Sequence, residues 1–126
     1  AQISSELKRP VNHLEEVEDP LGIWRSFVNT ELAGDYQTLF DKIDYRIMLK
    51  APSFDCVYQW RLEQEHKLAQ KALKDSDGVM SDEEVANFVQ HYQRITEHAL
   101  CHLPEKCDTV FYLDETRTIT KQDVKR

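Results

Sequence analysis

The sequence has few glycines, and none of them lies in a phosphate-binding loop. Gly22, Gly34 and Gly78 are the only three in 126 residues, whereas a GxxxxGK[ST] loop needs two glycines and a lysine on one short segment. Backbone amides of such a loop hold the phosphates of ATP. The 126-residue sequence therefore lacks a phosphate-binding loop, and we do not expect it to form a complete nucleotide-using enzyme.

Long apolar runs, an excess of basic residues and paired cysteines are also missing. No stretch approaches the roughly 20 apolar residues of a membrane span, and no secretory signal is visible. The formal net charge of −7 argues against nucleic-acid binding, because phosphate backbones need a basic face. Three cysteines without a CxxC pair fit a reducing compartment. We therefore expect a cytoplasmic protein that binds neither nucleic acid nor membrane.

What the sequence does contain is a helix-rich pattern. Asp19, Ser53 and Ser81 are suited to cap helices, and Glu84 completes a capping box with Ser81. Apolar residues recur at steps of three and four, as on one face of a helix. The predicted helices cover about residues 20–32, 35–42, 53–74 and 81–103.

Two short apolar segments are predicted to be buried strands. Tyr45–Lys50 stops before Pro52, and Thr109–Leu113 is rich in β-branched and aromatic residues. Strands joined by a helical crossover are parallel, and so small a pair indicates the last part of a doubly wound sheet whose other strands lie outside the chain. The remainder is predicted to be an irregular start at 1–18, a loop without EF-hand spacing at 75–78, and a frayed tail after 119.

Four segments carry a resemblance to a known kinase family. They are DPLGIWRSFVN (19–29), APSFDCVYQWRLEQE (51–65), MSDEEVANFVQHYQRIT (80–96) and DTVFYLD (108–114), and YQWRLEQE at 58–65 is the most specific part. In order and spacing they resemble the C-terminal portion of predicted ATP-dependent kinases similar to D-glycerate 3-kinase. That family is related to phosphoribulokinase, uridine kinase and pantothenate kinase.

The resemblance implies a fold and a partial function. The fold would be helix-rich α/β, the C-terminal part of a doubly wound parallel P-loop kinase sheet with a helical lid inserted between two parallel strands. The segments would be a lead-in (1–18), helices and a strand (19–52), a lid-like helical pair (53–104), and the last strand and tail (105–126), together one partial domain. The full-length protein would use ATP and Mg²⁺ to phosphorylate a hydroxyl of a small acid, whereas this chain alone would bind neither and be inactive.

Candidate catalytic residues follow from the same resemblance. Phosphoryl transfer needs positive groups on the moving phosphoryl, and in such kinases the lid supplies arginines. Arg61 is the first candidate, with Glu65 one turn later to orient it, and Arg94 is the second. The remaining candidates, for binding the acceptor, are Tyr58, Trp60, Gln64, Glu65, His91 and Tyr92. The plainer alternatives are a surface Arg61–Glu65 ion pair, worth about 0.3–0.5 kcal/mol, and aromatic residues that merely fill the core.

A metal site is not predicted. His98 and His102 are four residues apart on one helical face, a spacing at which two imidazoles can share a zinc ion. A site needs three or four ligands, however, and no HExxH or other cluster with ligand spacing is present. Cys101 beside them has no oxyanion hole or orienting acid that would make it a nucleophile.

The alternative function is a stand-alone, non-catalytic helical interaction module. It predicts a stable monomer that needs no further strands. The kinase hypothesis instead leaves the edge of Tyr45–Lys50 bare, and bare apolar edges pair with other chains. It therefore predicts self-association, as a homodimer through the exposed strand edge.

Overall fold

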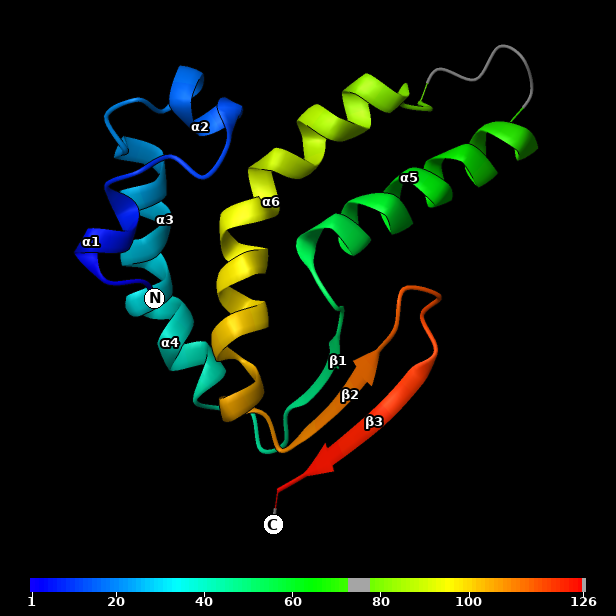
Figure 1. Cartoon of the computed structure of the whole chain (residues 1–126). Coiled ribbons are helices and arrows are strands. Elements are labelled where there is room, and N and C mark those ends of the chain that lie inside the picture. Colours follow the sequence, from blue (N-terminus) through cyan, green and yellow to red (C-terminus); the bar gives the residue numbers. More distant parts are fainter. Residues whose placement is uncertain (73–77, 126) are drawn as a thin grey trace.

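The computed structural model describes residues 1–72 and 78–125, and in these ranges it is helix-rich with one small sheet (Figure 1). A first group of helices precedes the sheet, and two long helices are inserted between its first two strands. In chain order the elements are α1 (Ser4–Leu7), α2 (His13–Glu18), α3 (Ile23–Ala33), α4 (Asp35–Phe40), β1 (Ile47–Lys50), α5 (Phe54–Lys71), α6 (Asp82–His102), the 3₁₀ helix η1 (Pro104–Lys106), β2 (Thr109–Leu113) and β3 (Ile119–Val124).

The sheet has three strands in the order β1-β2-β3 and is mixed. β1 runs parallel to β2, with Met48 opposite Val110, as the helical crossover predicts. β2 runs antiparallel to β3, with Phe111 opposite Gln122. The predicted α/β class is confirmed in this coarse form, a helix-rich chain with a small mixed sheet.

The prediction of a frayed tail after residue 119 is wrong, because these residues form β3. A tight turn returns the chain beside β2. Asp114 Oδ1 accepts hydrogen bonds from the backbone N–H of Thr116 at 2.8 Å and of Thr118 at 2.9 Å, and Arg117 adopts a left-handed φ of 67°. The Thr116 hydroxyl donates to the same oxygen at 2.7 Å, and this bond together with the backbone bonds lowers the pKa of Asp114, since they favour its ionised form.

The prediction of an irregular start at 1–18 is also wrong, because this segment contains α1 and α2. Both helices are short, so a helical period is hard to detect in their sequence. Asn12 caps α2, accepting from Glu15 N at 3.0 Å, and its amide nitrogen donates to Gln90 O on α6 at 2.9 Å. Contacts with a distant helix therefore order a segment whose own pattern is weak.

The third helix starts three residues later than predicted, and its N-cap is Gly22 rather than the predicted Asp19, although the Asp19 carboxylate still satisfies N–H groups of its first turn. Asp19 accepts hydrogen bonds from Trp24 N at 3.0 Å and Arg25 N at 3.1 Å. Pro20 lies in a turn before the helix rather than in its first position. The chain enters α3 through Gly22, whose φ of 70° is costly for residues with a side chain.

The two long helices begin at their predicted caps. Ser53 Oγ accepts from Cys56 N at 3.3 Å, and Ser81 Oγ accepts from Glu84 N at 3.2 Å. The predicted end of the first helix near residue 74, and residues 75–77 of the predicted loop, lie outside the described part of the chain. Among the described residues, no helix is long and apolar enough to cross a bilayer.

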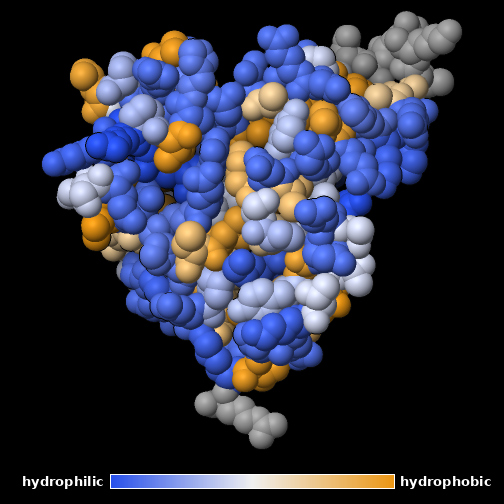
Figure 2. Space-filling model, in the orientation of Figure 1, coloured by the Kyte–Doolittle hydropathy of each residue, from blue (hydrophilic) through white to orange (hydrophobic). Residues whose placement is uncertain are grey.

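One hydrophobic cluster lies where the C-terminal half of α6 meets the sheet, and Val85 and Val89 in the N-terminal half of α6 are also buried. Met48, Cys107 and Val110 are buried together, with Leu100 of α6 and Tyr112 packed against them. Burial raises the pKa of the Cys107 thiol. Many large apolar side chains stay exposed instead, among them Trp24 at 68% and Leu49 at 64%. Figure 2 shows such hydrophobic patches on an otherwise hydrophilic surface.

Candidate functional site

Arg61 lies where α5 and α6 pack together, in a cluster with Gln64, Glu65 and Phe88. Its Nη1 donates to Gln64 Oε1 at 2.8 Å, and its Nη2 lies 3.1 Å from Glu65 Oε2. The guanidinium sits over the Phe88 ring, 5.7 Å from the centroid, in a cation–π contact. Three independent contacts thus hold the arginine in one orientation.

Glu65 is the most buried charged residue of this cluster, at 1% exposure. Its Oε1 accepts from Met80 N at 2.8 Å, which ties α5 to the segment that leads into α6. Its Oε2 lies 3.1 Å from Arg61 Nη2 and is buried, with no hydrogen-bond donor among the residues that the structure describes. We interpret the pair as an ionic contact through which a buried carboxylate positions a partly exposed arginine.

Within the described part of the chain, the contacts of Arg61 leave hydrogen-bond donors for a ligand. A guanidinium has five N–H groups. Arg61 donates one hydrogen bond to Gln64, and its contact with Glu65 is an ion pair. The side chain is 31% exposed, so its outer edge reaches solvent. Tyr92, whose ring lies 5.3 Å from that of Phe88, extends the cluster along α6. This arrangement can bind an anionic oxygen such as one of a phosphoryl group.

Arg94 is placed differently, on another side of α6 and against the N-terminal segment. Its Nε and Nη2 both donate to the Glu15 carboxylate at 2.8 Å. Its Nη1 donates to Glu6 O at 2.8 Å and Gln2 Oε1 at 3.3 Å, and Nη2 also donates to Arg9 O at 2.6 Å. These five hydrogen bonds match its five N–H groups, which leaves none for a phosphate in this arrangement.

Two carboxylates of the N-terminal segment, Glu15 and Asp19, have lowered pKa values. Burial raises the pKa of Glu15, but hydrogen bonds from Arg94 and Val11 and the charge of Arg94 outweigh it, so the pKa is lowered. Asp19 behaves likewise, since hydrogen bonds from Trp24 and Arg25 overcome its desolvation and lower its pKa. Both carboxylates are therefore ionised at neutral pH.

His91 and Arg94 line a cavity of about 590 Å³ between α6 and the N-terminal helices. Trp24, Val28 and Ile95 give it an apolar wall. His91 is exposed, with Nδ1 3.1 Å from Phe88 O. These two candidates thus face the N-terminal helices, whereas the Arg61 cluster lies between α5 and α6.

Trp60 lies on a different face of α5 from Arg61, against the turn between β2 and β3. Its Nε1 donates to Glu115 O at 2.9 Å, and the Arg117 guanidinium lies 5.8 Å from its ring. Arg117 also pairs with Glu63 at 2.8 Å, and hydrogen bonds from Lys67 and Arg117 lower the pKa of Glu63. The hollow beside Trp60, of about 650 Å³, is lined by Asp55, Glu63 and Glu115, an acidic lining that disfavours an anionic acceptor.

The structure therefore places some of the predicted site residues in one cluster and others outside it. Arg61, Gln64 and Glu65 lie together, and Phe88 connects them to Tyr92. Trp60, His91 and Arg94 lie elsewhere, while Tyr58 is half-buried on α5. The roles of all these residues stay predictions. Phe88 was missed as a site residue, although its place in the apolar stripe of α6 puts it on the face toward α5.

Comparison with known proteins points to kinases. No family model matches the chain. It is 50% identical over 66 residues to an uncharacterized kinase, mug58, of Schizosaccharomyces pombe, a match that covers 52% of this chain and 22% of that protein. Its structure is similar to that of D-glycerate 3-kinase from Cryptococcus neoformans var. grubii, with a TM-score of 0.55 and 25% identity over 71% of this chain and 31% of the other.

Both matches bear on the resemblance predicted from the sequence. The chain spans about a fifth of the length of the curated relative, at 22%, and about a third of that of the solved structure, at 31%. The similarity to a C-terminal portion of a D-glycerate 3-kinase-like protein is confirmed.

Proposed function

We propose that this chain is the lid-and-last-strand part of an ATP-dependent small-molecule kinase that phosphorylates a hydroxyl of a small acid such as glycerate. The observation that carries the proposal is the 66-residue stretch half identical to a kinase, together with the structural match to D-glycerate 3-kinase. In this proposal the sheet is the end of a doubly wound P-loop sheet, and the phosphate-binding loop is supplied by residues outside these 126.

The bare edge of β1 supports this placement. Within residues 1–72 and 78–125, β1 pairs only with β2, and the side chains of Ile47 and Leu49 are 62% and 64% exposed. Parallel strands of doubly wound folds are apolar because both faces of the sheet are covered. A further strand beside β1, with its covering helix, would satisfy the open backbone edge and bury these side chains.

ATP and Mg²⁺ do not fit this chain by itself. The sequence contains no GxxxxGK[ST] loop, so the backbone amides and the lysine that hold ATP phosphates are missing from it. ATP bound elsewhere in the full-length protein would supply the phosphoryl group. The contribution of this chain would be to place Arg61 against that group, with Glu65 holding the guanidinium in position and Gln64, Tyr58 and Tyr92 beside the acceptor.

A phosphotransfer assay tests the proposal. The 126-residue chain and the longest product of the same gene are each incubated with Mg²⁺, ATP and D-glycerate, and phosphoglycerate is measured against a no-protein blank. We expect transfer by the longer product and none by the 126 residues. Transfer by the 126 residues alone would show that the missing loop is not needed, and the absence of any transfer from ATP to glycerate or other small hydroxy acids by the longer product would refute the kinase function.

Self-association is a second consequence of the bare β1 edge. Two copies of the isolated chain can satisfy their open backbone groups by pairing at β1. Light scattering at rising concentration should then show a dimer, and Leu49→Lys, which places a charge on the edge strand, should shift it toward monomer. A monomer at all concentrations would instead favour the alternative, a stand-alone interaction module.

A further inference from the structure

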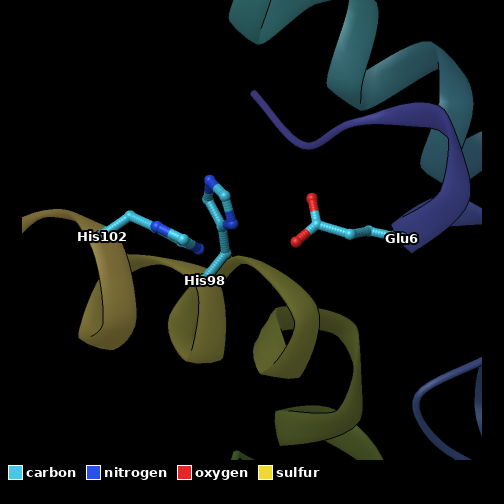
Figure 3. Close-up of side chains that lie close together, drawn as sticks. All are labelled: Glu6, His98 and His102. Carbon is cyan, nitrogen blue, oxygen red and sulfur yellow. The ribbon is translucent and has the colours of Figure 1, made fainter.

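Two histidines of α6 lie side by side near its C-terminal end. His98 and His102 are one helical turn apart, and their ring centroids are separated by 4.4 Å (Figure 3). Histidines at this spacing on one helical face can ligate the same metal ion. A pair alone binds metals weakly, however, and a protein site needs at least a third ligand.

The fold brings that third ligand from the opposite end of the sequence. Glu6 of α1 points toward the two rings, and the candidate ligand atoms of Glu6, His98 and His102 all lie within 4.8 Å of one another. In a tetrahedral zinc site with bonds of about 2.0–2.1 Å, neighbouring ligand atoms are about 3.4 Å apart. Small side-chain rotations would close the difference, since Glu6 and His102 are exposed.

The position of Glu6 is fixed by its backbone and not left to a loose terminus. Its carbonyl oxygen accepts from Arg94 Nη1 at 2.8 Å, one turn of α6 before His98. Its Oε2 accepts from Ile3 N at 2.9 Å, which orients the carboxylate. The same arginine that anchors the N-terminal segment therefore sets the distance between the carboxylate and the histidines.

We propose that Glu6, His98 and His102 bind one Zn²⁺ ion. Two imidazole nitrogens and one carboxylate oxygen form a donor set that zinc accepts, with the fourth tetrahedral position left for water or another ligand. A metal-binding imidazole must be neutral, so binding is expected to weaken in acid. The ion would fasten α1 to the part of α6 that packs on the sheet, a coupling that is independent of the kinase function.

Calorimetric titration of the 126-residue chain with ZnCl₂ tests this site. We expect one ion per chain and, with Zn²⁺ in excess, a higher melting temperature, because the ion binds the folded state. His102→Ala and Glu6→Gln each remove one ligand at an exposed position and should weaken binding at least about tenfold, as well as abolish the rise in melting temperature. Circular dichroism of both variants checks that they remain folded.

Two matched variants control for other donors. His66, which hydrogen-bonds Asp82 at 2.6 Å, and Cys101, which neighbours His102 in sequence, could each offer a ligand of their own. His66→Ala and Cys101→Ser should therefore leave the affinity for Zn²⁺ unchanged. The proposal is overturned by the absence of binding, by binding that survives both His102→Ala and Glu6→Gln, or by binding that disappears in Cys101→Ser.

Discussion

Arg94 and Glu15, 79 residues apart in sequence, form a two-pronged ion pair in which Nε and Nη2 of the arginine each donate to a different carboxylate oxygen at 2.8 Å. The arginine and glutamate side chains are only 8% and 13% exposed. The same guanidinium binds the carbonyl oxygens of Glu6 and Arg9. A single side chain of α6 thus contacts α1, α2 and the residues between them.

Removing this arginine should destabilise the chain strongly. Arg94→Met leaves the Glu15 carboxylate and two carbonyl groups without their donors, which should lower the free energy of unfolding by about 3 kcal/mol. Urea denaturation followed by circular dichroism measures the loss. As a control, Arg117→Met removes an exposed pair with Glu63 and should cost less than about 1 kcal/mol. Equal losses in both variants would contradict the anchoring role.

The lowered pKa values of Glu15 and Asp19 predict a loss of stability in acid. Each carboxyl group binds protons less readily in the folded state than in the unfolded chain. Their stabilisation is therefore complete above the unfolded pKa values of about 4 and is lost as the pH falls through the lower folded values. The contribution of these two carboxyl groups to the urea midpoint should stay level from pH 7 to about 5 and then decline.

Matched variants separate this effect from general acid denaturation. Glu15→Gln should reduce the slope of stability against pH below about pH 4.5, because the variant has no carboxyl group to protonate at that position. Glu16→Gln, at an exposed neighbouring position of α2, should leave the slope unchanged. If both variants follow the wild-type curve, the Glu15 pair does not contribute to the acid transition.

Gly22 should not tolerate a side chain. Its φ is 70°, and an added Cβ would lie 3.2 Å from the guanidinium of Arg25, which itself pairs with Asp19. Gly22→Ala should therefore lower the free energy of unfolding by about 1–2 kcal/mol. Ser26→Ala, at an exposed position of α3, should change it by no more than about 0.5 kcal/mol. A Gly22→Ala variant as stable as the wild type would rule out this tight entry into α3.

Arg61 should matter for turnover in a catalytically active longer protein. Because we propose that it stabilises charge on the transferred phosphoryl group, Arg61→Gln should lower kcat about 100-fold or more. The melting temperature should also fall, because the variant leaves the buried Glu65 carboxylate without its ionic partner, so kcat is compared at a temperature at which both proteins are folded. Lys71→Gln removes a positive charge at the exposed end of the same helix and should keep kcat near the wild-type value. A rise in KM alone, with kcat unchanged, would indicate that Arg61 contributes only to substrate binding.

The sequence predicted those features that rest on local chemistry. Ser53 and Ser81 mark the starts of α5 and α6 because a hydroxyl cap satisfies backbone N–H groups within its own turn. The cluster of Arg61, Gln64 and Glu65 follows from spacings of three and four on one helix. Such features need no knowledge of the tertiary structure.

The features that were missed depend on contacts between distant segments. Arg94 and Gln90 of α6 hold α1 and α2 by hydrogen bonds, and no local pattern in residues 1–18 predicts these contacts. β3 is polar and exposed over most of its length, so it lacks the apolar alternation of a half-buried strand. For the same reason the sequence did not show that Glu6 lies beside His98 and His102, because Glu6 is more than 90 positions away from both histidines.

The decisive measurement is the gene sequence upstream of the codon for Ala1, because in the proposed kinase the phosphate-binding loop lies outside these 126 residues. We expect an in-frame GxxxxGK[ST] motif there, preceded by a short apolar strand. A start codon immediately before Ala1, with no such motif in frame, would contradict it and direct the search toward a binding partner.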